Sequence, residues 1–241
     1  MTSHVVIVTG SSSGIGTETA RSFAGSGAGV VVNSVRSVAE GEAVAASLPD
    51  AIYVQGDIAD PQAAQKLVDA ALARWGRLDT LVNNAGTTEV IPHHDLEAAS
   101  VDVWRRIFEV NVFATWTMTL AALPALRQAN GSVVNISSVA GLRPTGSSIP
   151  YAASKAALNH LTVLLAKVVG PEVRVNAVAP GLIDTPWTAD WEFQRAAVSA
   201  VAPLKRIGQP DDVAEVVLAV ARSAYMTGQV VAIDGGLTIA L

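Results

Sequence analysis

The sequence predicts an α/β protein built on one doubly wound parallel sheet of seven strands, with helices on both faces. Three observations predict this fold class. Short apolar runs alternate with amphipathic stretches along the whole chain, as strands and helices do in a parallel sheet. The runs are rich in Val and Ile, which is typical of strands buried on both faces. Half of the 241 residues are hydrophobic, enough for a large core, and no linker or repeat interrupts the pattern, so we interpret residues 1–241 as a single domain.

Each expected strand is a short run of β-branched or small apolar residues, and each expected helix is an amphipathic stretch between two such runs. The strands are expected over Val5–Thr9, Val30–Asn33, Ile52–Gln55, Thr80–Asn83, Ser132–Ser137, Arg174–Val178 and Val230–Ile233. The helices are expected over Ile15–Ser26, Val38–Leu48, Pro61–Trp75, Val101–Gln128, Tyr151–Val169 and Asp211–Ala221. Ligands of such folds bind beyond the carboxyl ends of the strands, and the motifs described below fall at those ends.

Composition excludes several classes of function. The net charge of −5 argues against a nucleic-acid partner, which would require a basic face. The chain has no Cys, which excludes disulfides and thiolate metal sites. No uninterrupted apolar segment is long enough for a membrane span, and the N-terminus lacks a basic signal region, so we expect a cytoplasmic protein without a membrane partner. His93 and His94 lack a third ligand at metal spacing, and we expect no metal site.

A glycine-rich loop, Thr9-Gly-Ser-Ser-Ser-Gly-Ile-Gly16, follows the first strand and opens the first helix. Glycines let the backbone turn sharply and approach a phosphate, and the helix N-terminus points amide dipoles at the anion. This context predicts a dinucleotide phosphate site, although a purely structural Gly/Ser turn would give the same pattern. The residues expected to bind the cofactor in this loop are Gly10, Ser12, Ser13, Gly14, Ile15 and Gly16.

Tyr151 and Lys155 occupy positions i and i+4 of an alanine-rich stretch that is expected to be helical, so their side chains share one face. A nearby ammonium favours the phenolate, and we expect it to lower the tyrosine pKa from about 10. A tyrosine tuned in this way is a general acid/base, with Ser138 available to bind the reacting oxygen. A tyrosine packed beside a solvated lysine is the alternative interpretation of the same spacing.

Taken together, five ordered motifs resemble the short-chain dehydrogenase/reductase family over essentially the whole chain. They are the glycine-rich loop, Asn83-Asn84-Ala85-Gly86, Asn111, the set of Ser138, Tyr151 and Lys155, and Pro180-Gly181. The resemblance implies a Rossmann-type sheet, a nicotinamide cofactor, hydride transfer, and a homotetramer or else a homodimer.

The family pattern also implies a role for each matched residue. Tyr151 would exchange the proton, Lys155 would lower its pKa and hold the nicotinamide ribose, and Ser138, rather than its neighbour Ser137, would bind the substrate oxygen. Asn111 would keep a water beside Lys155, although an asparagine at a helix kink is the alternative interpretation. The remaining expected cofactor contacts are Asp57 and Ile58 near the adenine, Asn84, Ala85 and Gly86 beside the adenosine, and Pro180, Gly181, Ile183 and Thr185 beside the nicotinamide.

The choice between NADP and NAD depends on the segment after the second strand. Ser34 follows Asn33 and holds the position where an NAD-specific site has a carboxylate, and Arg36 lies two residues further on. A guanidinium without a competing carboxylate suits a 2′-phosphate. We therefore expect NADP(H), with NAD(H) as the alternative, because Ser13 stands where many NADP-dependent members have a basic residue.

We expect the substrate to lie under a segment, about 182–207, that carries Trp187, Trp191 and Phe193; packing of a short helix would explain this aromatic cluster as well. The two longest expected helices carry apolar residues on a second side, and this pattern predicts contact with another copy of the chain. The residues are Trp116 with Leu120 on the first helix and Leu161 with Leu165 on the second. The expected function is interconversion of a carbonyl and a secondary alcohol on a small molecule. A 3-oxoacyl thioester or a generic ketone is the expected substrate; a sugar or polyol dehydrogenase and a non-catalytic cofactor sensor are the alternatives.

Overall fold

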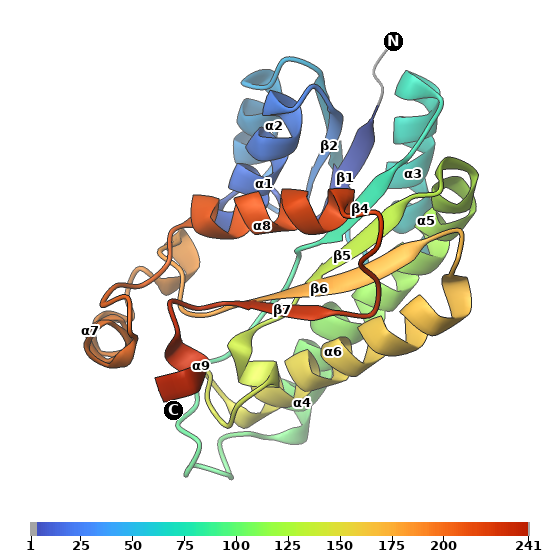
Figure 1. Cartoon of the computed structure of the whole chain (residues 1–241). Coiled ribbons are helices and arrows are strands. Elements are labelled where there is room, and N and C mark those ends of the chain that lie inside the picture. Colours follow the sequence, from blue (N-terminus) through green and yellow to red (C-terminus); the bar gives the residue numbers. More distant parts are fainter. Residues whose placement is uncertain (1–3, 241) are drawn as a thin grey trace.

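The computed structural model describes residues 4–240, in which seven parallel strands form one sheet of order β3-β2-β1-β4-β5-β6-β7 (Figure 1). The strands are β1 (Val5–Val8), β2 (Gly29–Ser34), β3 (Ala51–Gln55), β4 (Thr80–Asn83), β5 (Ser132–Ile136), β6 (Arg174–Pro180) and β7 (Val230–Ile233). The strand order reverses between β1 and β4, and such a switch point is where doubly wound sheets bind ligands. The expected fold class is therefore confirmed.

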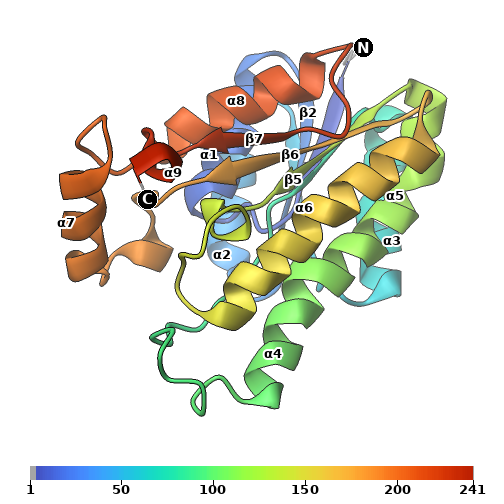
Figure 2. The same cartoon turned by 60° about the horizontal axis from the view of Figure 1, so that its bottom comes forward.

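Helices cover both faces of the sheet (Figure 2). They are α1 (Gly14–Gly25), α2 (Val38–Ala46), α3 (Pro61–Trp75), α4 (Val101–Phe108), α5 (Thr115–Ala129), α6 (Ile149–Val169), α7 (Glu192–Val201), α8 (Pro210–Arg222) and α9 (Leu237–Ala240). As expected, α3 begins at Pro61. It is capped by Asp60, whose side chain accepts a hydrogen bond from the Gln62 amide at 2.9 Å.

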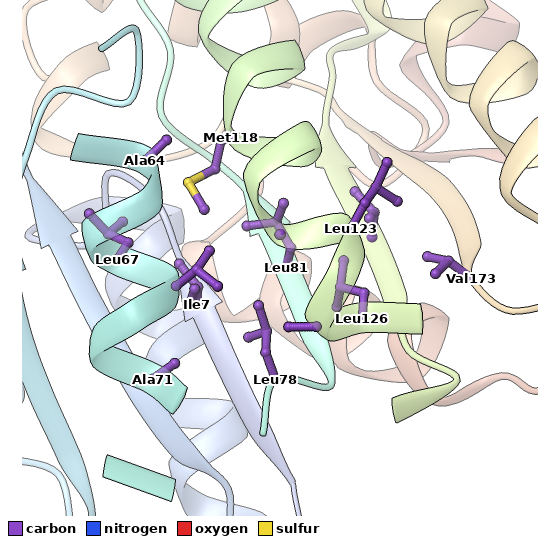
Figure 3. Packing of buried hydrophobic residues seen from close by; sticks show 14 of the residues in the cluster. Ile7, Ala64, Leu67, Ala71, Leu78, Leu81, Met118, Leu123, Leu126 and Val173 are labelled. Atoms are coloured by element: carbon purple, nitrogen blue, oxygen red, sulfur yellow. The ribbon is translucent and has the colours of Figure 1, made fainter. Parts of the chain in front are cut away.

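Successive side chains of each buried strand point to opposite faces of the sheet, and this divides the core into two clusters. Val5 and Ile7 of β1 point to the face covered by α3, α5 and α6, where Figure 3 shows Ile7 packed among Leu67, Leu81 and Met118. Val6 and Val8 point to the opposite face, which α1, α2 and α8 cover. This two-sided burial explains why the strands are continuous apolar runs with no polar alternation.

The long helix expected over Val101–Gln128 is interrupted. α4 and α5 are joined by the π-helical segment η1 (Glu109–Ala114), which contains Asn111. Within residues 4–240, the run Val101–Ala129 is the one helix whose length and composition would allow a membrane span. It packs against α3, α6 and β4 and so forms part of the domain.

The exposed apolar residues match the expectation on α5 but differ from it on α6. Trp116 and Leu120 of α5 are 41% and 45% exposed, as an intersubunit contact requires. Leu165, however, is buried in the core, and Leu161 packs against the same cluster, because the phase of α6 turns both toward the sheet. The exposed apolar residues of α6 are instead Val163, Leu164 and Val168. We call Trp116, Leu120 and these three residues the α5–α6 apolar surface.

Candidate active site

A cavity of about 850 Å³ lies beyond the carboxyl ends of the strands, within the range of about 300–1,000 Å³ that is usual for ligand pockets. Most of the residues expected in the site line it together. They are Gly10, Ser12, Ser13, Gly14, Ile15, Gly16, Ser34, Arg36, Asn84, Ala85, Gly86, Ser138, Tyr151, Lys155, Pro180, Gly181, Ile183 and Thr185. Asn33, Asp57, Ile58 and Asn111 are not among its lining residues.

Three of these exceptions lie near the expected adenine end. The Asn33 side chain is buried, accepting from the Gly10 amide and donating to the Val54 and Gly56 carbonyls. Ile58 is buried in the core cluster under α3. Asp57 is exposed, and its carboxylate accepts from the Ala59 amide at 3.0 Å. The side chains of Asn33 and Ile58 therefore serve the fold, and a cofactor contact at these two positions stays a prediction that only their backbones could fulfil.

The glycine-rich loop is compact enough to bring its backbone against a diphosphate. Gly10 has φ +60°, and a Cβ there would lie 2.8 Å from the Ala85 Cα. Asn84 fixes the loop by donating from Nδ2 to the Thr9 and Gly10 carbonyls, each at 2.9 Å. No side chain caps the N-terminus of α1, whose first residues line the cavity. These amides fit an anionic phosphate group, as a dinucleotide cofactor requires.

The segment after β2 also fits a phosphate. The Ser34 hydroxyl donates a hydrogen bond to the Ser37 carbonyl and forms another with the Tyr53 hydroxyl, each at 2.9 Å. Arg36 is exposed and lines the cavity. Among the lining residues that the structure describes, none is Asp or Glu, and the two charged ones are Arg36 and Lys155. The cavity is thus positive in a chain whose net charge is −5.

Tyr151 and Lys155 lie on one face of α6, as the spacing predicts. The Lys155 ammonium is 5.7 Å from the centroid of the Tyr151 ring and donates to the Ile136 carbonyl at the end of β5, at 2.9 Å. Ser138, two residues beyond Ile136, forms a side-chain hydrogen bond with Tyr151. The hydroxyl, the phenol and the ammonium therefore meet at one end of the cavity.

Ser137 is less suited than Ser138 to bind the substrate oxygen. Its side chain is buried and donates to the Lys155 carbonyl and to Asn159 Oδ1, which ties the end of β5 to α6. Both serines line the cavity, but Ser138 is only partly buried, and its side chain is not tied to α6 in this way. The contacts of the two neighbours thus favour Ser138, as the family spacing does.

Burial shifts the pKa values of both catalytic candidates. It raises the pKa of the Tyr151 phenol to about 12, against a smaller lowering by the hydrogen bond with Ser138. This direction is opposite to the expected one, because burial disfavours the charged phenolate and the hydrogen bond with Ser138 offsets only part of that effect. Burial also lowers the pKa of the Lys155 ammonium to about 8. Near neutral pH the pair is a neutral phenol beside a cation, the form that donates a proton.

Asn111 holds the site together from the π-helical segment. Its Oδ1 accepts from the Thr87 amide at 2.8 Å, and its Nδ2 donates to the Thr87 carbonyl at 3.0 Å and to Ser154 Oγ at 2.9 Å. It therefore links the loop after β4 to α6, one residue from Lys155. The Asn111 carbonyl accepts from the Thr115 hydroxyl at 3.2 Å. A π-helical turn often marks a functional position, and here it turns this side chain inward.

Aromatic side chains border the cavity beside Tyr151. The Trp187 ring meets Tyr151 edge-on, with centroids 6.4 Å apart, and Trp191 and Phe193 line the same wall. No residue of α7 is buried, and Figure 1 shows this helix standing away from the sheet. The aromatic residues expected to cover the substrate thus lie at the cavity.

His93 lines the cavity, although its sequence pattern did not place it among the expected site residues. It is partly buried in the loop between β4 and α4, whereas His94 beside it is exposed. The only signal in the sequence was its position after a strand end. Among the described residues, no group of His, Asp and Glu is arranged to hold a metal ion.

Comparison with known proteins identifies the family. A family model described as "Enoyl-(Acyl carrier protein) reductase" matches residues 10–238. A crystal structure from Burkholderia xenovorans, described as a short-chain dehydrogenase/reductase, superposes with a TM-score of 0.92 at 37% identity and covers 99% of each chain. The chain belongs to the short-chain dehydrogenase/reductase family.

Two relatives of this short-chain dehydrogenase/reductase are described as reductases. Ketoacyl reductase 2 of the granaticin polyketide synthase of Streptomyces violaceoruber is 56% identical over 236 residues, which cover 96% of this chain and 95% of the relative. The 3-oxoacyl-[acyl-carrier-protein] reductase FabG of Thermotoga maritima is 38% identical over 244 residues, covering 98% of each. The chain is an NAD(P)-dependent oxidoreductase that acts on carbonyl and alcohol groups.

The pKa of Lys155 leads to a testable pH dependence for this short-chain dehydrogenase/reductase. Because burial lowers that pKa to about 8, the ammonium is present below this pH and is lost above it. We expect kcat/KM for carbonyl reduction to fall about tenfold per pH unit above about pH 8, while Tyr151 stays protonated. Steady-state rates across this range check the expectation.

The control variant is Lys155→Arg, because a guanidinium keeps its charge throughout the range. We expect this variant to be slower but to lose the descending limb of the profile. The same limb in both proteins would show that another group titrates.

Proposed function

We propose that this chain is an NADP(H)-dependent ketone reductase that acts on 3-oxoacyl compounds, with Tyr151 as proton donor. The observation that carries the proposal is the joint placement of Ser138, Tyr151 and Lys155 in the cavity that the glycine-rich loop also lines. The cofactor, when bound, supplies the hydride. Ser138 and Tyr151 hold the substrate carbonyl oxygen through their hydroxyls, at the place where negative charge develops.

The proton states of the site support reduction. Burial keeps Tyr151 as a neutral phenol, so it can give its proton to the carbonyl oxygen and complete the alcohol. The Lys155 ammonium then faces the phenolate that remains and stabilises its charge. Asn111 keeps α6 in register with the loop after β4, so these groups remain in reach of one another.

The substrate end of the cavity supports a ketone or oxoacyl compound over a sugar. Its walls include Val90, Val139, Leu182, Trp187 and Phe193, which offer a larger apolar surface than the polar side chains of Thr145 and Gln194 beside them. A relative described as L-fucose dehydrogenase from Bos taurus is 37% identical, so the family accommodates sugars elsewhere. A polyol would leave hydroxyl groups unpaired against these walls. The complete Ser-Tyr-Lys set also speaks against a non-catalytic sensor.

The α5–α6 apolar surface supports a homo-oligomer, a tetramer or else a dimer. Exposed apolar surface of this kind on two neighbouring helices is typical of an interface. Light scattering that found a monomer at every concentration would contradict it. We also propose that the protein acts in the cytoplasm, as the sequence suggests.

Tyr151→Phe tests the proton donor. It removes only the hydroxyl, and we expect kcat/KM for a 3-oxo ester to fall by about 10²–10⁴-fold, because general acid catalysis contributes that much. The dissociation constant of NADPH, measured by fluorescence, should change little. Tyr225→Phe is the matched control, since Tyr225 is fully exposed. Turnover that persists in Tyr151→Phe would contradict the assignment.

Arg36→Ala tests the cofactor preference. A charged hydrogen bond to the 2′-phosphate contributes about 1.5–3 kcal/mol, so we expect KM for NADPH to rise about 10- to 100-fold and KM for NADH to stay within about twofold. Arg21→Ala, on the exposed surface of α1, is the control. Wild-type preference for NADH, or equal losses with both cofactors, would contradict NADP(H).

A further inference from the structure

Helix α7 has an apolar face that the described chain, residues 4–240, leaves largely uncovered. No residue of α7 is buried, and the side chains of Phe193 and Val201 are 82% and 46% exposed. An amphipathic helix of a globular protein normally packs its apolar side against the core. Figure 2 shows α7 standing apart from the sheet instead. The apolar face of α7 is thus available to a ligand.

This face is part of the wall of the cavity that Tyr151 also lines. Five residues of α7 line the cavity and share one side of the helix. They are Phe193, Ala197 and Val201, at positions i, i+4 and i+8, with Gln194 and Val198 beside them. At a rise of 1.5 Å per residue, the cavity follows α7 for about 12 Å from Phe193 to Val201. A ligand that extends from Tyr151 along this wall would cover the apolar face.

Contacts on its other side and at its end hold α7 in place. Arg195 is not among the lining residues, and its Nη1 donates to Asp184 Oδ1 in the loop after β6 at 2.7 Å. Ala202, directly after α7, is buried, and the Leu204 amide donates to the Gly235 carbonyl at 3.0 Å. The lining face of α7 therefore has a defined orientation toward the cavity.

The chemistry of the wall indicates a hydrocarbon ligand. Gln194 is the one polar residue among the five of α7, and none of the described lining residues is Asp or Glu. Trp187, which meets Tyr151 edge-on, and Trp191, the residue before α7, line the same cavity. A hydrocarbon chain that covers such exposed apolar groups removes them from water, which favours binding. A chain attached to a carbonyl held at Tyr151 can therefore follow an apolar wall onto α7.

We propose that α7 forms an acyl-chain subsite, in which Phe193 and Val201 contact the hydrocarbon chain of the substrate beyond the carbonyl that is reduced. The subsite selects 3-oxoacyl compounds whose chains have several methylene groups over short ones. This inference rests on the proposed function, because it assumes that Ser138 and Tyr151 hold the reacting carbonyl.

The test measures kcat/KM with NADPH for ethyl 3-oxobutanoate, ethyl 3-oxohexanoate and ethyl 3-oxooctanoate. Full burial of one methylene group strengthens binding about fourfold, so we expect kcat/KM to rise about two- to fourfold per methylene, and about 20- to 200-fold from the shortest ester to the longest. Phe193→Ser should lower this ratio by about three- to tenfold, because it removes apolar surface from the subsite. Phe193→Leu, which stays apolar, should keep most of the ratio.

Leu96→Ser is the matched control, because Leu96 is 68% exposed but does not line the cavity, and it should keep the wild-type ratio. Circular dichroism and NADPH binding check that each variant is folded; if Phe193→Ser is not, Val201→Ser provides the same comparison.

A wild-type ratio near one, or a ratio that Phe193→Ser leaves unchanged, would overturn the subsite alone. An unchanged ratio with a smaller assembly in light scattering would assign the apolar face of α7 to a second copy of the chain, which also overturns the subsite. A wild-type protein that reduces none of the three esters would instead overturn the proposed function, and the subsite with it.

Discussion

The buried ammonium of Lys155 is the constraint on which the site depends. A charge removed from water is unfavourable unless polar groups surround it, and here the hydrogen bond that Lys155 makes is to the Ile136 carbonyl. Burial lowers its pKa only to about 8, so the cation persists at neutral pH. The same burial keeps Tyr151 protonated. One low-dielectric environment thus produces a proton donor and the charge that stabilises its conjugate base.

The parallel sheet supplies this environment by bringing together segments distant in sequence. β4 and β5 are neighbours, so the loop that Asn111 holds and the strand end that receives Lys155 lie side by side. Asn84 joins the end of β4 to the glycine-rich loop after β1. The segments that we propose to bind the cofactor and to carry the catalytic residues are therefore parts of one hydrogen-bonded edge, and a change at Asn84 or Asn111 would disturb both.

Much of this could be predicted from the sequence, because strand burial and helix spacing leave periodic signals. The strands, the start of α3 at Pro61, and the pairing of Tyr151 with Lys155 are local consequences of residue order. The pKa of Tyr151 could not be predicted, since desolvation depends on how deeply the whole fold buries the phenol. Nor could the place of His93, which is fixed by contacts between its loop and Ser147, far away in sequence. The side of α6 that faces the sheet likewise depends on tertiary packing, which places Leu165 in the core.

The most direct test of the account is the ionisation of Tyr151 itself. The chain contains three tyrosines, so the difference in tyrosinate absorbance between wild type and Tyr151→Phe isolates this phenol during a pH titration. With a pKa raised to about 12, Tyr151 should contribute no tyrosinate signal where an ordinary phenol, with a pKa of about 10, is half ionised. A difference signal with a midpoint at or below that ordinary value would contradict the claim that burial holds Tyr151 as a neutral proton donor.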